Sequence, residues 1–205
     1  MVSLLILLIP FFLVVVLNIM LKKNSKKFGK KILWQHRLFG YLFILYLMIN
    51  LVQVGVPSWF ECKISLNQGQ PIFHTDNMNL VPFKDSLDIT SILNIILFMP
   101  FGIFLPTLWD KYRKLLPTFC YGFTFSLIIE VSQLFTRNRT FDINDLIFNT
   151  LGTVCGWVVF NSLREIFYKL ADKTVVKSLP SDTFISKLEP HLYIVIAFIC
   201  VFFSY

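Results

Sequence analysis

The sequence predicts an all-α, polytopic membrane protein, a helix bundle with about six transmembrane helices. Hydrophobic residues make up 56% of the 205-residue chain and charged residues only 15%, whereas a soluble domain carries about 25% charged residues. The mean hydropathy of +0.68 agrees with this composition. The charged residues also gather in short segments between long apolar runs. About 20 apolar residues are enough for an α-helix to cross the bilayer.

Six apolar runs are candidates for such helices. No lysine precedes the first run and no small-residue cleavage site follows it, so we expect a retained helix rather than a cleaved signal. The last run has only 15 residues, so we expect its final turn to thin the bilayer or to stop early. The expected helices cover residues 2–21, 38–56, 91–109, 118–135, 146–163 and 191–205.

Small and polar residues inside these runs predict how the helices pack. In the second run, Asn50 is expected to hydrogen-bond to a neighbouring helix. In the third, Pro100 removes a backbone hydrogen bond and is expected to kink the helix. In the fifth, Gly152 and Gly156 have the G-x-x-x-G spacing that allows close helix contact. We expect this pair to serve packing within the chain rather than dimerisation.

Basic residues alternate along the chain and predict its orientation. Residues 22–37, 110–117 and 164–190 hold 15 of the 19 Lys and Arg, and the intervening segments 57–90 and 136–145 hold the other four. Loops rich in Lys and Arg stay in the cytoplasm. We therefore expect the N-terminus outside and the polar segment after the fourth run at the outer face.

The placement of the charge also bears on partners. The net charge of +7 comes from lysines beside apolar runs, which indicates contact with anionic membrane lipids rather than with nucleic acid. No two of the four cysteines share a C-x-x-C spacing, and three lie inside apolar runs. The sequence therefore predicts neither a disulfide framework nor a metal site, and no cofactor.

One acidic residue lies inside the fourth expected helix. Glu130 is five residues before the end of the run, which places it roughly 7–8 Å below the outer interface. An ionised carboxylate there costs on the order of 2–3 kcal/mol. Glu130 therefore needs a cationic partner, a hydrogen-bond network or a bound proton. Gln133 shares its helix face, and Arg137 follows near the interface.

A second polar group begins the fifth expected helix. Asp142, Asp145 and Asn149 are spaced i, i+3 and i+7 and so form one stripe, with Arg139 just before them. The connection to the fourth run has only ten residues, so the two helices are expected to be antiparallel neighbours. A structural alternative remains open, in which Asp142 is the N-cap of the helix and Asp145 is its N3 residue.

These polar residues are expected to converge on one outward-facing pocket. Asn94, near the outer end of the third run, is expected to join it. Glu130 is also the candidate for a catalytic residue. Its structural alternative is an intramembrane pair with an arginine that fixes helix packing. The candidate ligand-binding residues are Asn94, Glu130, Gln133, Arg137, Arg139, Asp142, Asp145 and Asn149.

Four sequence elements resemble the VanZ-like family of bacterial membrane proteins. They are "NLVPF" (79–83), "NIILFMPFGIFLP" (94–106), "IEVSQ" (129–133) and "RTFDINDLIFNTLG" (139–152), and they stand in the family's order. The resemblance covers about residues 79–160 of what we expect to be a single membrane domain, residues 1–205. It implies reduced susceptibility to teicoplanin, a lipid-tailed glycopeptide antibiotic, without a rebuilt peptidoglycan precursor. It also implies that the family's polar signature consists of Glu130, Gln133, Arg139, Asp142, Asp145 and Asn149.

Three functions remain open on the sequence. The first is a binding module whose pocket engages a lipid-linked envelope component or a lipid-tailed drug, with Arg137 and Arg139 pairing with phosphate or carboxylate. The second is a membrane enzyme that uses Glu130 as general acid or base. The third is proton-coupled transport, for which one buried glutamate and no internal repeat give thin support.

Overall fold

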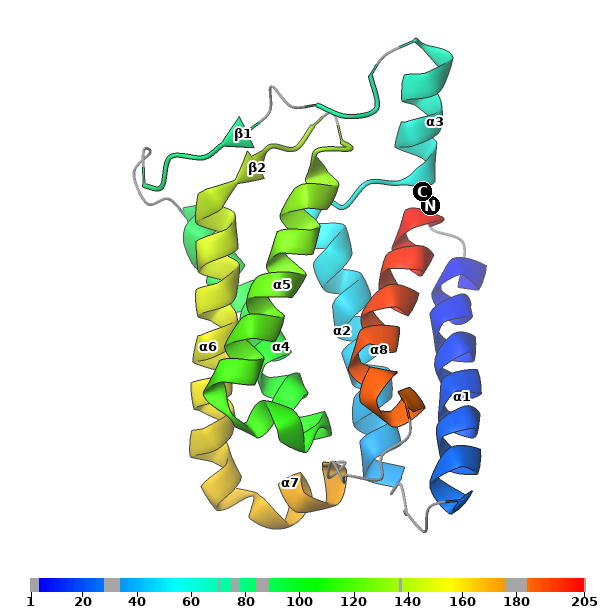
Figure 1. The fold of residues 1–205 in the computed structure, drawn as a ribbon, viewed down its shortest axis with the longest axis vertical. Helices are drawn as coiled ribbons and strands as arrows, with labels where there is room; N and C mark the ends of the chain where they lie inside the picture. Colours follow the sequence, from blue (N-terminus) through cyan, green and yellow to red (C-terminus); the bar gives the residue numbers. More distant parts are fainter. Residues whose placement is uncertain are drawn as a thin grey trace.

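A computed structural model of the protein describes residues 4–27, 34–69, 71–74, 78–83, 89–136, 138–175 and 184–204. In this part of the chain, six helices of 19 residues or more run alternately up and down as one bundle (Figure 1). They are α1 (Leu4–Lys27), α2 (Trp34–Val54), α4 (Ile89–Leu108), α5 (Leu115–Gln133), α6 (Ile143–Ile166) and α8 (Phe184–Phe202). The predicted all-α class is confirmed, and each long helix overlaps one predicted apolar run.

Short elements connect the long helices at the two ends of the bundle. The end shown at the top of Figure 1 carries the helix α3 (Trp59–Asn67) and two strands, β1 (Met78–Asn79) and β2 (Phe141–Asp142). We call it the β end. The opposite end carries the 3-10 helix η1 (Asp110–Arg113) and the helix α7 (Tyr168–Thr174). We call it the η1 end.

Four helical segments in the described residues are long and apolar enough to cross a membrane. The first takes in α2 and α3, and α1 adds a shorter apolar stretch, Ile9–Met20. The four segments are Trp34–Asn67, Ile89–Leu108, Leu115–Gln133 and Ile143–Ile166. The chain is thus a multi-pass membrane protein.

The outer surface of the bundle suits a lipid environment. Large apolar side chains point outward from several helices; Phe12, Leu116 and Ile166 are 67%, 69% and 70% exposed. A soluble monomer rarely exposes so many large apolar groups. In a bilayer, the same surface meets acyl chains, so its exposure carries no such penalty.

The last long helix begins earlier than predicted. The apolar pattern places its start at residue 191, whereas α8 begins at Phe184 and has 19 residues. The apolar pattern does not extend back to Phe184, because the charged residues Lys187 and Glu189 are typical of loops. Glu189 is nevertheless buried inside the bundle, where it has hydrogen-bond partners.

Glycines bring α4 and α6 into backbone contact. A Cβ built on Gly102 would lie 1.9 Å from the Thr153 carbonyl oxygen, and one on Gly156 would lie 2.0 Å from that of Met99. A Cβ built on Gly152 would likewise lie 2.4 Å from the Ile95 carbonyl oxygen. The predicted use of Gly152 and Gly156 for packing within the chain is confirmed. α4 itself is one continuous helix through Pro100.

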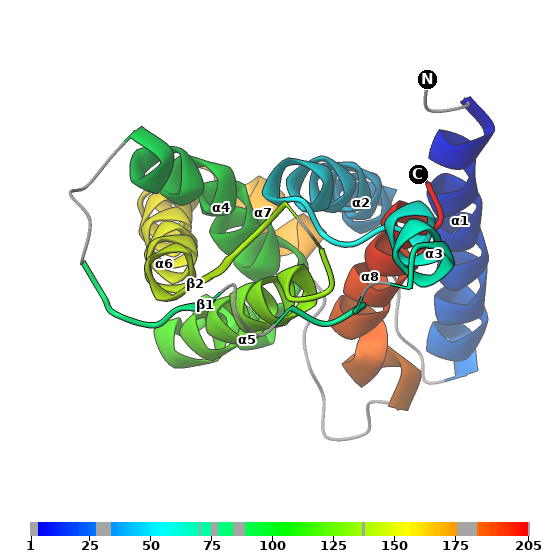
Figure 2. The same cartoon turned by 90° about the horizontal axis from the view of Figure 1, so that it is seen from above.

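An aromatic core joins the two halves of the bundle. Seen from above, α4, α5 and α6 form one group, while α1 and α8 lie on the far side of α2 (Figure 2). The Phe43 ring of α2 lies 5.9 Å from that of Phe101, 5.7 Å from that of Trp109 and 5.7 Å from that of Tyr193. Asn50 also bridges helices as predicted, because its side-chain amide donates to the Leu97 carbonyl of α4 at 3.4 Å.

Candidate functional site

The two strands bring distant parts of the sequence together at the β end. β1 and β2 pair in parallel, with Asn79 opposite Asp142. The Asn79 side-chain amide donates to Asp142 Oδ2 at 3.1 Å. Phe83, which has a positive φ of 56°, donates its backbone N–H to Asn144 Oδ1 at 2.9 Å. The segment after α3 is thus tied to the start of α6.

Asp142 is the N-cap of α6. Its backbone is extended, and its Oδ1 accepts the Asn144 N–H at 2.7 Å. Of the two alternatives left open for Asp142, the N-cap is the one that the structure shows. A carboxylate at this position also interacts favourably with the helix dipole.

Replacing Asp142 with alanine is expected to destabilise the protein by about 1–2 kcal/mol, because the cap and the bond to Asn79 are both lost. Asparagine caps a helix equally well, and its amide can donate to the Asn79 oxygen once the Asn79 amide turns over. Asp142→Asn should therefore cost less than about 0.5 kcal/mol. Thermal unfolding of the detergent-purified variants checks this expectation. Equal losses in the two variants would contradict the capping role.

Glu130 lies buried beneath this cap. Its side chain is 1% exposed, and its Oε2 accepts the backbone N–H of Asp142 at 3.1 Å. Asp145, Asp142 and Arg139 lie close enough to act electrostatically on it. A carboxyl group at this depth needs a hydrogen-bond partner. The hairpin between α5 and α6 supplies one, and the donor is the backbone amide of Asp142.

Asp145 connects α6 to α4. Its Oδ1 accepts the Asn94 side-chain amide at 2.7 Å, and both residues are half-buried. Asp142 and Asp145 thus lie nearer the surface, above the buried Glu130. We call the following residues the carboxylate cluster: Asn79, Asn94, Glu130, Asp142 and Asp145.

Gln133 and Arg139 turn toward α2 instead. Gln133 Nε2 donates to the Val54 carbonyl at 2.8 Å, and an Arg139 guanidinium nitrogen donates to the Gln53 carbonyl at 3.2 Å. The guanidinium also lies against Gly55, whose φ is +74° and where a Cβ would lie 2.5 Å from Arg139 Nε. A cation at a helix C-terminus satisfies the last carbonyls and opposes the dipole. Both side chains therefore hold the end of α2.

Two predicted site residues remain, Asn149 and Arg137. Asn149 is 1% exposed and donates to Ser126 Oγ at 3.1 Å, one turn below Glu130 along α5. It belongs to the buried contact between α5 and α6. Arg137 lies outside the described residues.

Two cavities lie at the η1 end, away from the carboxylate cluster. One of about 360 Å³ lies between α5 and α8, and one of about 380 Å³ lies between α1 and α2. The expected outward pocket therefore stays a prediction. Within the described ranges, no group of three His, Cys, Asp or Glu side chains is placed to hold a metal ion.

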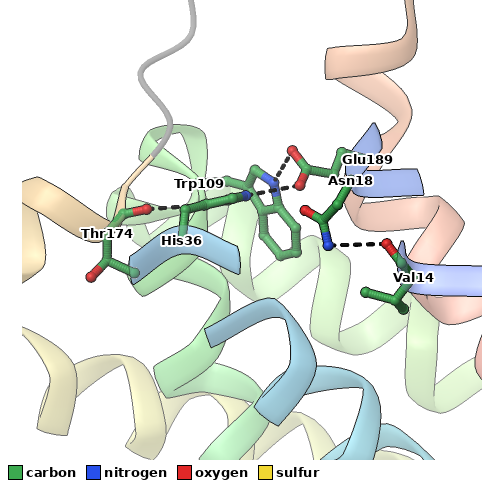
Figure 3. Close-up of polar contacts among 6 residues, drawn as sticks. All are labelled: Val14, Asn18, His36, Trp109, Thr174 and Glu189. Atoms are coloured by element: carbon green, nitrogen blue, oxygen red, sulfur yellow. Dashed lines mark hydrogen bonds and ion pairs between the residues drawn. The ribbon is translucent and has the colours of Figure 1, made fainter. Parts of the chain in front are cut away.

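Sequence reasoning missed a second buried polar cluster, which joins α2, α7, α8 and the start of η1 (Figure 3). His36 Nε2 lies 2.8 Å from Glu189 Oε1, and each residue is 1% exposed. His36 Nδ1 lies 2.9 Å from the Thr174 carbonyl oxygen, and Trp109 Nε1 donates to Glu189 Oε2 at 3.1 Å. The partners are 153 residues apart in sequence, so no local pattern indicates the pair.

The bonding pattern fixes where one proton of this cluster lies. A backbone carbonyl only accepts hydrogen bonds, so His36 Nδ1 must carry a proton. The second bond, between His36 Nε2 and Glu189, is then made either by an imidazolium and a carboxylate or by a neutral imidazole and a protonated carboxyl. The pair is electrically neutral in both cases, which lowers the cost of burying it.

Comparison with known proteins places these features in a wider group. The family model described as VanZ/LLP1 matches residues 43–167, from α2 to the end of α6. Among curated proteins, "Protein VanZ" of Enterococcus faecium is 29% identical over 106 residues, which are 51% of this chain and 65% of that protein. No solved structure matches the chain. The matched range contains the whole carboxylate cluster but neither His36 nor Glu189.

Proposed function

The chain belongs to the VanZ/LLP1 family, and from this premise we propose that it lowers the susceptibility of a bacterium to lipid-tailed glycopeptide antibiotics such as teicoplanin. It acts in the cell membrane, where the carboxylate cluster engages the drug or a lipid-linked component of the envelope. The proposal is supported by the similarity to the Enterococcus protein, which is 29% identical over 65% of that protein's length.

The single observation that carries the proposal is the gathering of three carboxylates at one membrane end. Glu130 of α5, Asp142 of β2 and Asp145 of α6 converge, in a chain with only 12 acidic residues. Acidic groups at membrane depth are costly and usually functional. The half-buried Asp142 and Asp145 suit an amine. The exposed Arg139 donates one hydrogen bond to the Gln53 carbonyl, and its other guanidinium donors suit a phosphate or a carboxylate. A zwitterionic or amphipathic ligand fits this combination.

The orientation supports the same function. We propose six crossings, with α1 and α8 as the first and last, and with the N-terminus outside. The basic segments follow α1, α4 and α6, which all reach the η1 end (Figure 1). If that end is cytoplasmic, the carboxylate cluster lies on the outer side, where a drug or an envelope precursor arrives.

Deletion and complementation test the proposal. A strain that lacks the gene should become more susceptible to a lipid-tailed glycopeptide and unchanged toward a tail-less one, and the intact gene should restore the difference. Minimal inhibitory concentrations measure both. Equal responses to the two drugs, or no response to either, would refute the glycopeptide function.

Glu130→Gln separates binding from acid–base chemistry. Glutamine retains an oxygen that accepts the Asp142 N–H, but it cannot ionise. A binding module should keep most of its effect, and Asp145→Asn should weaken it in a similar way. Minimal inhibitory concentrations, with membrane levels of each variant as the check on folding, give the answer. Complete loss in a folded Glu130→Gln protein would replace the binding module by an enzyme or a transporter. Glu165→Gln, on the exposed end of α6, is the matched control.

A further inference from the structure

The cavity between α5 and α8 has an apolar body. Its volume is about 360 Å³, and its walls include Pro117, Phe125, Ile128, Ile194 and Val195. It opens beside η1, at the end of the bundle opposite the carboxylate cluster. In a membrane, such a cavity between two helices is accessible to acyl chains.

Polar groups gather at one end of this cavity. Lys111, Tyr121 and His191 all line it. The Tyr121 hydroxyl lies 3.1 Å from His191 Nδ1. Lys111 Nζ lies 5.5 Å from the centre of the Tyr112 ring, and that ring lies 5.0 Å from the Tyr121 ring. The ammonium group, the hydroxyl and the imidazole therefore all belong to side chains that line the same cavity.

The charged side chain at this end of the cavity is a cation, Lys111. No acidic side chain is among the residues described as lining the cavity. Asp110 and Asp172 lie 3.7 Å and 3.1 Å from an Arg113 guanidinium nitrogen. Glu189, two residues before His191 on α8, is buried and bonded to His36 and Trp109. Lys111 is exposed and is a compact cation of the kind that binds phosphate. The site is thus complementary to an anionic head group.

We propose that this cavity binds an anionic phospholipid. One acyl chain lies between α5 and α8, and the phosphate contacts Lys111, Tyr121 and His191. Because an acyl chain finds similar surroundings anywhere in the bilayer, the head-group contacts provide the selectivity. The inference requires only that the chain spans a membrane, so it stands or falls independently of the proposed antibiotic function.

Thermal unfolding of the detergent-purified full chain tests the site. Dioleoyl phosphatidylglycerol should raise the unfolding midpoint more than dioleoyl phosphatidylcholine does. Lys111→Ala should reduce the effect of phosphatidylglycerol to that of phosphatidylcholine. Lys114→Ala is the matched control, because Lys114 is exposed nearby but does not line the cavity. Equal loss in both lysine variants would show a general surface charge effect and overturn the proposal.

Two further experiments identify the source of the phosphate and the position of the acyl chain. Inorganic phosphate at the same concentration should leave the midpoint unchanged; a rise equal to that with lipid would overturn the proposal. Cys120→Trp fills the cavity from its rim and should abolish the advantage of phosphatidylglycerol while Lys111 is intact. Native mass spectrometry of the wild type and Lys111→Ala gives a readout that does not depend on this variant. Equal retention of phosphatidylglycerol by the two proteins would count against the site.

Discussion

Replacing Gly156 with alanine is expected to destabilise the protein by about 3 kcal/mol or more, as overpacking against backbone does. The new Cβ would lie 2.0 Å from the Met99 carbonyl oxygen and 3.0 Å from the Gly102 Cα. Neither is a flexible side chain that can move aside, so α4 and α6 would have to separate along their length. Alanine's higher helix propensity offsets only about 1 kcal/mol of this cost. The unfolding midpoint in detergent and the folded fraction on size exclusion measure the loss.

Val158→Ala provides the matched control for this glycine. Val158 lies two residues further along α6 and is 50% exposed. Its replacement by alanine should change the free energy of unfolding by less than about 1 kcal/mol, because alanine favours the helix and little packing is lost. A Gly156→Ala protein as stable as Val158→Ala would show that α4 and α6 do not meet in this way.

Glu189→Ala is the second substitution with a large expected effect, a loss of about 3 kcal/mol. It leaves the Trp109 N–H and the His36 imidazole in the interior without their acceptor or charge partner. It also removes the link from α8 to α2 and to the start of η1. Thermal or denaturant unfolding of the purified protein checks the value.

Glu189→Gln tests the reason for that loss. A glutamine oxygen accepts the Trp109 N–H, and its amide donates to a neutral His36 whose Nδ1 proton still faces Thr174. We therefore expect Glu189→Gln to lose less than about 1.5 kcal/mol, as for the removal of one charge from a hydrogen bond. If both substitutions are equally damaging, the hydrogen-bond account of the pair is wrong.

The sequence predicted those features that depend on composition and local spacing. Long apolar runs located the helices, because backbone groups in a bilayer must bond within the segment. The position of Asp142 before an apolar run indicated its cap, and the spacing of Gly152 and Gly156 indicated a close helix contact. Each of these signals lies within a few residues of the feature that it predicts.

The sequence also carries a local signal for the short helix α3. Ser58 and Glu61 form a capping box at the start of α3, with the Ser58 hydroxyl accepting the Glu61 N–H and Glu61 accepting the Ser58 N–H. The spacing "SWFE" is the usual sign of such a box. A helix of nine residues with a weak apolar pattern is not distinguished from a loop by hydropathy alone.

The remaining features depend on which helices are neighbours. Spacing placed Gln133 on the same face as Glu130, but only the position of α2 decides that Gln133 bonds to the Val54 carbonyl. Likewise, the partner of Glu130 is the Asp142 backbone amide, a group that every sequence contains and no pattern distinguishes. His36 and Glu189 each resemble a loop residue until the fold brings them together.

The glycine contact between α4 and α6 also has a consequence for the recognition that we propose at the β end. Two helices that touch backbone to backbone at successive turns move as a rigid body, and α4 carries Asn94 while α6 carries Asp145. The separation of these two polar groups is therefore preset, whatever the neighbouring helices do. Binding of a partner that fits this spacing therefore costs little conformational entropy in the protein. The two helices do not adjust their separation to a partner of a different size.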